Sequence, residues 1–409
     1  KLRRSWGRLG MKSEWTYRPL GELVSFASGG TPSKKRDDYW GGTIPWISAK
    51  TLKTENIDTS DLFITEEGLK AGSKIAPKGS ILLLTRGSGL FNGIPIARVE
   101  KDVAFNQDIK CLDSYGEVEN EFIFYWLLSQ KDYLMAKVGV TGIGAGKFDL
   151  DFLQKLMIPI PSERERKSIV GFASSISEKI RCNAKVNDNL LWQAQALYKD
   201  RFIDLKPFNG KMPPDWQLGT VSEIIELHDS KRIPLSSRER ANLTKIYPYY
   251  GATSVMDYVD RYLFDGIYLL LGEDGTVVDD KGFPILQYVE GKFWVNNHAH
   301  IITGKNGFTV ETLYLLFSLT NVRSIVTGAV QPKISQANLN NVSVVIPSKA
   351  ELSTFTSIVQ PILSQIRNLR AESDRLTSTR DILLPRLMSG EIDAANIPVS
   401  YTHLTLPTT

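Results

Sequence analysis

Cysteine is almost absent from this sequence of 409 residues. The two cysteines, Cys111 and Cys182, lie far apart and show no metal-ligand spacing. We therefore expect no disulfide framework and a reducing compartment such as the cytoplasm. No run of about 18 apolar residues occurs, which argues against a membrane-spanning helix. The basic start, Lys1–Arg4, is not followed by the apolar segment of a signal peptide.

The sequence also lacks the common catalytic motifs. The segment Gly139–Lys147 is rich in glycine, but a P-loop needs glycine at Thr141 and a hydroxyl residue at Phe148. The one Pro-Pro pair, Pro213–Pro214, lacks the flanking residues of an adenine methyltransferase loop. We expect no catalytic residue, no metal ion and no cofactor in this chain.

Two further sets leave an enzyme as an open alternative. Carboxylates and a lysine in the second half could hold magnesium as nucleases do, if the fold gathers Asp279, Asp280, Glu290 and Lys292. Surface loops often supply such sets by accident. His298 and His300 alternate on a predicted strand, but two histidines make no complete metal site. A polar or DNA-facing strand edge is our preferred interpretation of that pair.

The length and composition are those of a globular protein with more than one domain. A hydrophobic content of 42% and a charged content of 23% are ordinary values, and 409 residues exceed one typical core. A net charge of +4 permits nucleic-acid binding without proving it.

An internal repeat is the strongest signal. Ile160-Pro161-Ser162 recurs as Ile346-Pro347-Ser348, an offset of 186 residues (346 − 160). Each serine is followed three residues later by a glutamate, which forms the capping box that starts a helix. Further matches accompany the repeat; they pair Thr141-Gly142 with Thr327-Gly328, Lys147 with Lys333, Leu20–Leu23 with Val221–Ile224, Gly79–Leu84 with Gly266–Leu271, and Val103–Asn106 with Phe293–Asn296.

Long amphipathic helices are predicted after both capping boxes. Apolar residues follow each box at spacings of 3, 4 and 4, namely Ile169, Phe172, Ile176 and Ile180, and then Phe355, Ile358, Ile362 and Ile366. The first stripe weakens at Asn183, Ala184 and Asn187. Heptad-like seams of this kind are typical of paired helices about 50 Å long. Helices buried within their own domains are the plainer alternative, and Pro361 predicts a kink or an irregular start.

The connectivity predicts a pseudo-two-fold molecule of the α+β class. We expect a mostly-β first domain at 11–161, a helix at 162–203, a linker and second domain at 204–347, a helix at 348–392 and a tail at 393–409. Strand patterns occupy Ile81–Thr85, Ile94–Val99, Ile267–Leu271 and Phe293–Val295, with short helices near Glu121–Ser129 and Glu311–Leu319. If the long helices pair, they run antiparallel with one domain at each end. We treat residues 1–10 and 401–409 as foreign to the fold, with Met11 as the start.

Polar, basic and aromatic residues share the predicted loops of both domains. Lysine and arginine neutralise phosphates, arginine reads guanine, and Asn or Gln reads adenine. The alternative for each residue is an ordinary solvated surface. As a set they predict DNA contact; the first domain offers Thr31, Ser33, Lys34, Lys35, Arg36, Trp46, Ser48, Lys50, Arg86, Ser88, Asn106, Gln107 and Lys147. The second domain offers Lys231, Arg232, Tyr249, Tyr250, Asn296, Asn297, His298, His300, Gln331 and Lys333.

The chain resembles the DNA-specificity (S) subunits of type I restriction–modification systems from about Trp15 to Ile392. The resemblance rests on the doubled Ile-Pro-Ser caps and on five further stretches, Ser28–Ser33, Ile44–Ser48, Phe105–Gln107, Thr327–Ile334 and Thr379–Ile392. The second domain departs from it, because Asp229–Pro234 replaces the Gly-Gly-Thr-Pro opening of the first.

The resemblance implies two target-recognition domains that each read one half of a split double-stranded DNA sequence. Two antiparallel helices would set the gap and dock two methyltransferase (M) subunits, which carry S-adenosylmethionine and methylate adenine. Whether a restriction (R) subunit joins stays open. The chain itself would catalyse nothing. A stand-alone nuclease and a two-headed scaffold that binds proteins are the alternatives.

Overall fold

The computed structural model describes residues 15–140, 144–328 and 330–394. The expected start at Met11, the Thr141-Gly142 match and the tail beyond Ala394 lie outside these residues. Two compact units divide the chain, one formed by residues 1–180 and 374–409 and the other by residues 181–373. We call residues 15–161 the first domain and residues 204–347 the second domain. Each unit contains one domain together with a part of each of two long helices.

The first domain is built on a five-stranded sheet in the order β2-β11-β7-β9-β4. Its central strand, β7 (Ile81–Leu84), is wholly apolar and buried on both faces. Helix α3 (Asn120–Ser129) completes the core, because its residues 122–128 are all apolar and buried. The other strands of this sheet are β2 (Val24–Ser28), β4 (Asn56–Ile57), β9 (Ile96–Val99) and β11 (Ile109–Ser114).

A second sheet of the first domain has the order β5-β3-β10-β6. Its strands are β3 (Trp40–Ile47), β5 (Phe63–Ile64), β6 (Lys74–Ala76) and β10 (Val103–Phe105), next to helix α2 (Glu66–Gly72). The shorter elements of this domain are β1 (Thr16–Pro19), α1 (Leu20–Leu23), η2 (Asp37–Tyr39), β8 (Arg86–Gly87), η3 (Ser88–Phe91), α4 (Lys131–Met135), β12 (Gly139–Val140), β13 (Gly146–Lys147), α5 (Leu150–Gln154) and β14 (Met157–Ile160).

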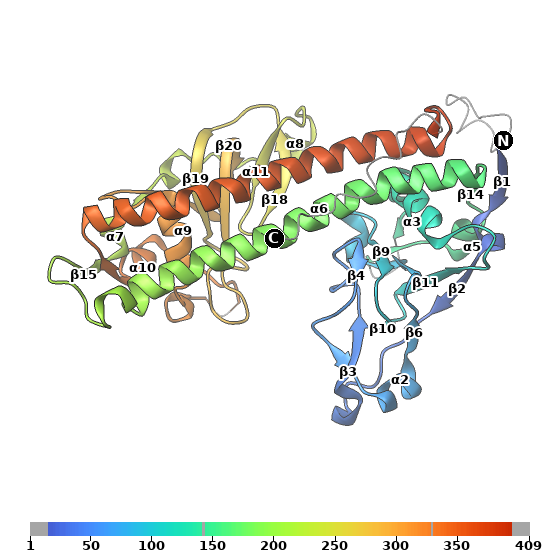
Figure 1. The fold of residues 1–409 in the computed structure, drawn as a ribbon, viewed down its shortest axis with the longest axis horizontal. Helices are drawn as coiled ribbons and strands as arrows, with labels where there is room; N and C mark the ends of the chain where they lie inside the picture. Colours follow the sequence, from blue (N-terminus) through green and yellow to red (C-terminus); the bar gives the residue numbers. More distant parts are fainter. Residues whose placement is uncertain (1–14, 141–143, 329, 395–409) are drawn as a thin grey trace, which may run out of the picture. The chain divides into compact units, whose positions relative to one another are not determined.

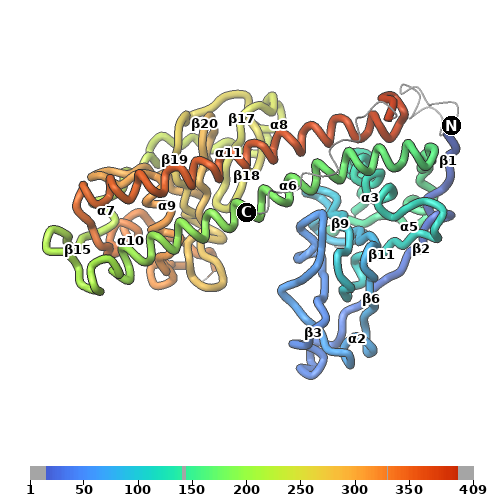
Figure 2. The backbone as a smooth tube through the Cα atoms, viewed as in Figure 1, coloured from blue at the N-terminus to red at the C-terminus, as the bar shows by residue number. Residues whose placement is uncertain are grey.

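The second domain has one six-stranded sheet, in the order β16-β21-β19-β20-β17-β18. Figure 2 traces its backbone from yellow-green to orange. The strands are β16 (Ile225–Leu227), β17 (Tyr247–Tyr250), β18 (Val255–Val259), β19 (Phe264–Gly272), β20 (Leu286–Val295) and β21 (Ala299–Gly304). The remaining elements are β15 (Gln217–Thr220), α7 (Val221–Ile224), η6 (Asp229–Lys231), α8 (Ser237–Ala241), α9 (Val310–Ser318), η7 (Arg323–Ile325), α10 (Gln336–Asn340) and β22 (Ser343–Ile346).

Matched backbone hydrogen bonds confirm the repeat. Leu20 N–H donates to Leu156 O in the first domain, and Val221 N–H donates to Val342 O in the second. The parallel pairing of β10 with β3 recurs as β20 with β17. The predicted alignment of Gly79–Leu84 is wrong by one residue, because Leu84 pairs with Ile109 where Gly272 pairs with Ala299. The two mostly-β domains and the α+β class are as predicted.

Both long helices form, α6 (Glu163–Tyr198) and α11 (Lys349–Met388) (Figure 1). The first capping box is complete: Ser162 N–H donates to Glu165 Oε2 at 3.1 Å, and Glu165 N–H donates to Ser162 Oγ at 3.4 Å. The second is half made, because Glu351 N–H donates to Ser348 Oγ at 3.4 Å while the Glu351 carboxylate pairs with Arg201.

Within each unit the two helices pack against each other and against the domain core. In the unit of residues 181–373, Asn183 contacts Glu372, and Tyr198, fifteen residues later, contacts Phe355, so the pair is antiparallel. In the other unit Arg380 donates to Ser177 Oγ at 3.1 Å. Both interpretations of the helices therefore hold, since they pair and also complete the domain cores.

The second apolar seam is shifted from the prediction. Its buried residues are Leu352, Phe355, Val359, Leu363 and Ile366, whereas Ile358 is 44% exposed and Ile362 is partly buried. Of the two outcomes predicted at Pro361, the irregular start is wrong, because α11 continues through this exposed proline as one helix, while the kink stays a prediction. Neither helix is long and apolar enough to cross a bilayer, and the same holds for every shorter helix within the described ranges.

The predicted linker reverses the chain after α6. A π-helical turn at Lys199–Ile203, inside the range predicted for the helix, precedes the linker, which itself contains a 3-10 turn at Lys206–Phe208. Phe202 lies 5.6 Å from Trp216 and 4.8 Å from Phe355, measured between ring centroids. This aromatic cluster fixes the linker to the start of α11.

Candidate nucleic-acid interface

Four loops of the first domain meet where β10 ends. Gly30 N–H donates to Phe105 O at 2.9 Å, Asn106 N–H to Ile47 O at 2.9 Å, and Thr85 N–H to Asp108 O at 2.8 Å. A Cβ at Gly29 would lie 2.0 Å from Phe105 O, so only glycine allows this approach. Backbone contacts therefore gather the segments 28–31, 47–50, 85–88 and 105–108.

Exposed polar side chains line this loop cluster. Thr31 donates from its hydroxyl to Gln107 Oε1 at 2.7 Å. Arg86 and Lys147 stand directly opposite each other on β8 and β13, and both are exposed. Like charges in such a cross-strand pair repel, and within residues 15–140, 144–328 and 330–394 neither has an ion-pair partner. A polyanion would relieve this repulsion.

The second domain builds the same cluster with different side chains. Glu273 N–H donates to His298 O at 2.8 Å as Thr85 does to Asp108, and Ile334 N–H donates to Glu273 O at 2.8 Å as Phe148 does to Thr85. By this equivalence Asp274 corresponds to Arg86, and Lys333 corresponds to Lys147. The backbones of Asp274 and Lys333 form an antiparallel β-bridge. The cross-strand pair therefore has two positive charges in the first domain (Arg86 and Lys147), and one negative and one positive charge in the second (Asp274 and Lys333).

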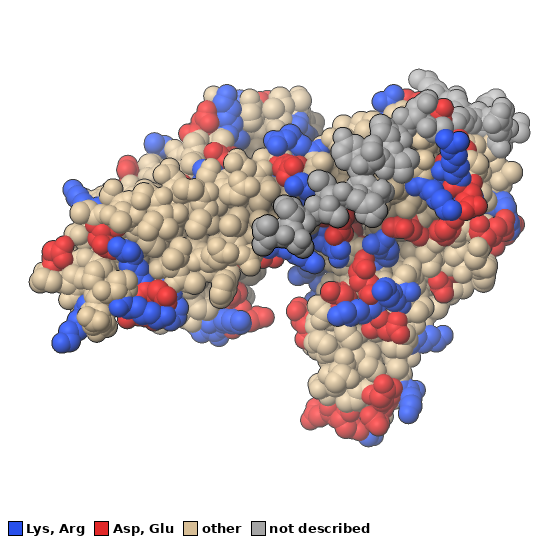
Figure 3. Space-filling model, in the orientation of Figure 1, with Lys and Arg blue, Asp and Glu red and all other residues tan. Residues whose placement is uncertain are grey.

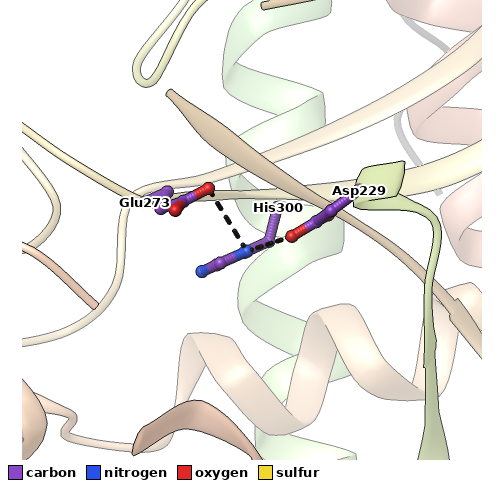
Figure 4. A group of neighbouring side chains, drawn as sticks. All are labelled: Asp229, Glu273 and His300. Atoms are coloured by element: carbon purple, nitrogen blue, oxygen red, sulfur yellow. Dashed lines mark hydrogen bonds and ion pairs between the residues drawn. The ribbon is translucent and has the colours of Figure 1, made fainter. Parts of the chain in front are cut away.

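A buried polar network holds the loops of the second domain together (Figure 4). His300 Nδ1 lies 2.6 Å from Asp229 Oδ2 and 3.6 Å from Glu273 Oε2, and His300 Nε2 lies 2.8 Å from Ile334 O. Arg232 NH1 donates to Glu273 at 2.6 Å and to Ala299 O at 2.8 Å. Lys333 Nζ lies 3.2 Å from Glu273.

Asp229, Glu273 and His300 have the composition and closeness of a metal site, their ligand atoms lying within 4.8 Å of one another. Burial opposes ionisation of Asp229, but hydrogen bonds from His300, Ile301 N–H and Gln336 outweigh it and lower the pKa of Asp229. Burial also opposes ionisation of Glu273, but the hydrogen bond from Arg232, with smaller contributions from its other partners, lowers the pKa of Glu273 overall. Because Arg232 and Lys333 already neutralise these carboxylates, the set is an ion-pair network.

Part of the predicted DNA-contacting set is buried, and the contact of these residues with DNA stays a prediction. Five of its side chains have at most 6% of their surface exposed, and they are Trp46, Asn106, Tyr249, Asn296 and His300. They position the loops: Asn106 and Asn296 each accept a hydrogen bond from the backbone two residues on, at 3.1 and 2.8 Å. The side chain of Arg232 is 13% exposed and engaged in the network.

The remaining predicted residues stay exposed or half-buried, and their contact with DNA stays a prediction. At or near the two loop clusters these are Thr31, Ser48, Lys50, Arg86, Ser88, Gln107, Lys147, Lys231, Tyr250, Asn297, His298, Gln331 and Lys333. His298 precedes β21, where it pairs with Asp274. The turn that presents Gln331 needs Gly328, whose φ is +86° and whose Cβ would lie 2.3 Å from Gln331 O.

Ser33, Lys34, Lys35 and Arg36 belong to an acidic part of the first domain. Arg36 donates to Asp38 at 2.6 Å, and Asp37 is exposed beside it. Acidic side chains gather around β3 and α2 in the space-filling view (Figure 3). This segment is the weakest of the predicted DNA-contacting sets.

The nuclease-like set does not come together as a metal site. Asp279 Oδ1 accepts from the backbone of Phe283 at 2.8 Å, Glu290 pairs with Arg367 at 2.9 Å, and Lys292 lies 4.7 Å from the Tyr262 ring. Among the described residues, Asp229, Glu273 and His300 form the one metal-like group. The sequence reasoning missed Asp229, Glu273 and Gln336, whose role depends on contacts between distant segments.

Comparisons with known proteins agree with this architecture. The sequence profile of the type I restriction modification DNA specificity domain matches residues 12–191 and again residues 213–378. The MjaIX specificity subunit of Methanocaldococcus jannaschii is 26% identical over 93% of this chain and 94% of its own length. The EcoprrI specificity subunit of Escherichia coli is 22% identical over 90% of this chain and 92% of its own.

A solved structure has the same fold. The S subunit of a type I restriction–modification system from M. genitalium superimposes with a TM-score of 0.52 at 18% identity, covering 93% of this chain and 98% of that chain. Two profile matches coincide with two domains whose hydrogen bonds repeat. The chain therefore belongs to the family of type I restriction–modification DNA specificity subunits.

Proposed function

We propose that this chain reads a bipartite double-stranded DNA sequence, one half with each domain, and that it docks DNA methyltransferase subunits that do the chemistry. The observation that carries the proposal is the pair of loop clusters. They share backbone hydrogen bonds but present Arg86 and Gln107 in one domain, and Asp274 and Asn297 at the equivalent positions of the other. Equal scaffolds with unequal side chains suit two different half-sites.

The proposal assigns no catalytic step to this chain. Phosphate contacts would come from exposed cations such as Arg86, Lys147 and Lys231, and base contacts from amides such as Gln107 and Asn297. The methyltransferase partners would bind S-adenosylmethionine and extrude the target adenine. A restriction subunit would add cleavage to such an assembly. The antiparallel helices would set the gap between the half-sites.

A selection experiment tests this function. The chain, purified together with its methyltransferase, is mixed with a pool of random duplexes, and the bound sequences are read at several salt concentrations. We expect two unlike half-sites at one constant gap and an affinity that falls steeply with salt. Salt-independent binding to a protein partner without DNA selection would favour a scaffold. Metal-dependent cleavage by the chain alone, lost in Asp280→Ala, would favour a nuclease.

A further inference from the structure

In the unit of residues 181–373, the polar residue Asn183 is buried at the contact between α6 and α11. Asn183 is 1% exposed, and its side-chain nitrogen donates to Glu372 Oε2 at 2.8 Å and to Ser373 Oγ at 3.2 Å. It also lies 3.5 Å from Leu369 O. The apolar stripe of α6 is interrupted at this point, so the amide occupies a place that packing alone would give to an aliphatic residue.

The position of Asn183 in the repeat is special. Its counterpart at the offset of 186 is Leu369 (183 + 186), which is the residue whose carbonyl it approaches. In an antiparallel pair of repeated helices, a residue meets its own counterpart at one place only. Asn183 therefore lies within one turn of the place where a residue of α6 faces its own counterpart on α11, and a slip of either helix moves that place.

We propose that Asn183 fixes the register of α6 against α11, and so determines the gap between the DNA half-sites. The second clause rests on the proposed function. A slip of one heptad would place the amide beside Ile362, Gln365 and Ile366, or beside Leu376, Thr379 and Arg380. Neither set offers a carboxylate, so the charge-assisted bond to Glu372 is lost. A single polar residue in an apolar seam selects one register in this way.

Asn187 supplies a matched control one turn further along α6. Its Oδ1 is buried, and no partner for it lies among the described residues. An Asn187→Leu variant removes a buried amide from the same helix without removing a bond between the helices. It should leave the register unchanged.

The register can be measured on the chain alone by pulsed electron paramagnetic resonance. Nitroxide labels go on Cys182, which is exposed, and on an introduced Ser357→Cys on α11, while Cys111 is buried. We expect one distance in the parent chain and in Asn187→Leu. We expect a second population in Asn183→Leu, displaced by several ångströms because a heptad spans about 10 Å. A single unchanged distance in Asn183→Leu overturns the proposal.

A double variant tests the symmetry argument. In Asn183→Leu with Leu369→Asn, the amide moves to the counterpart position, where Asn187 Oδ1 is its expected acceptor. We expect one distance again, and two populations in the double variant contradict the argument. Methylation mapping of Asn183→Leu should then show two gaps where the parent shows one. If Asn183→Leu gives two distances but the parent chain directs no methylation, the proposed role of Asn183 in the register is supported and the proposed function is contradicted.

Discussion

At the scale of single residues, Arg86 is the sharpest test of the interface in the first domain. It is exposed and faces Lys147 across the strand pair. We expect Arg86→Ala to weaken DNA binding by about 1–3 kcal/mol if the side chain reads a base, or to reduce the salt slope by about one if it contacts a phosphate. Binding titrations of the methyltransferase complex at three salt concentrations measure both quantities.

Lys101 provides the control for this change. It is also exposed, but it precedes β10, whereas the loop cluster lies after that strand. Lys101→Ala should bind as the parent chain does. Equal affinities and equal salt slopes for the parent and Arg86→Ala would remove Arg86 from the site.

The network around Asp229 makes a pH-dependent contribution to stability. Because its folded-state pKa is lowered, its ionised form stabilises the fold above the unfolded value of about 4, and this contribution disappears as pH falls further. We expect Asp229→Asn to lower the free energy of unfolding by about 3 kcal/mol at pH 7, because it breaks a buried ion-pair network. Denaturant titrations of both chains between pH 7 and pH 3 should show the difference shrinking toward acid pH.

Asp280→Asn serves as the matched control, because Asp280 is exposed and bonds to Arg323 through its backbone carbonyl. It should unfold as the parent chain does. A difference between the parent and Asp229→Asn that stays constant down to pH 3 would show that ionisation of Asp229 is not the cause.

Residue-level prediction succeeded where the chemistry is local. The turn residues Asn106 and Asn296 fall on loops as expected, and their side-chain oxygens accept hydrogen bonds from the backbone N–H groups of Asp108 and His298. Tyr249 and His300 were placed on the surface because sequence does not show what packs over a strand; both are buried beneath other segments. The Asp229 network joins residues about 70 positions apart, which no local pattern could reveal.

At the scale of elements, the capping box of α6 gives a direct prediction. We expect Ser162→Ala to cost about 1 kcal/mol of stability, because the hydroxyl satisfies the free Glu165 N–H at the helix start. Denaturant unfolding measures this cost. Ser353→Ala, on the exposed surface of α11, is the control and should be neutral or slightly stabilising. Equal stabilities of Ser162→Ala and Ser353→Ala would count against the cap.

The elements themselves were largely predictable. Strong apolar runs gave β7 and α3 within one or two residues of their observed bounds. The seam of α11 was read one residue out of phase, at Ile358 instead of Val359, because apolar residues occupy adjacent positions along it. The continuity of α11 through Pro361 shows how tertiary packing overrides an unfavourable local residue.

The length of the helix pair should control the spacing of the half-sites. Deleting one heptad from each helix at paired positions removes about 10 Å, which corresponds to about three base pairs of DNA. We expect the gap to shorten by about that amount while both half-site sequences stay the same. If the helices still form but the gap in the methylation map is unchanged, the length of the helices does not set the spacing of the half-sites.

At the scale of the whole molecule, we propose that two domains of one design, carrying different side chains on equivalent loops, read two different half-sites for a partner that methylates DNA. The doubling of the fold could be predicted because the Ile-Pro-Ser caps and the offset of 186 are written in the sequence. The bases read could not, because they depend on side-chain geometry against DNA.

Methylome mapping tests this claim most directly. The chain and its methyltransferase are expressed together in a host that lacks adenine methylation, and every methylated adenine is located. The account predicts one asymmetric bipartite motif with a constant gap, and a change confined to one half-site when the loops of one domain are replaced. A single uninterrupted motif, or methylation that does not depend on this chain, would contradict it.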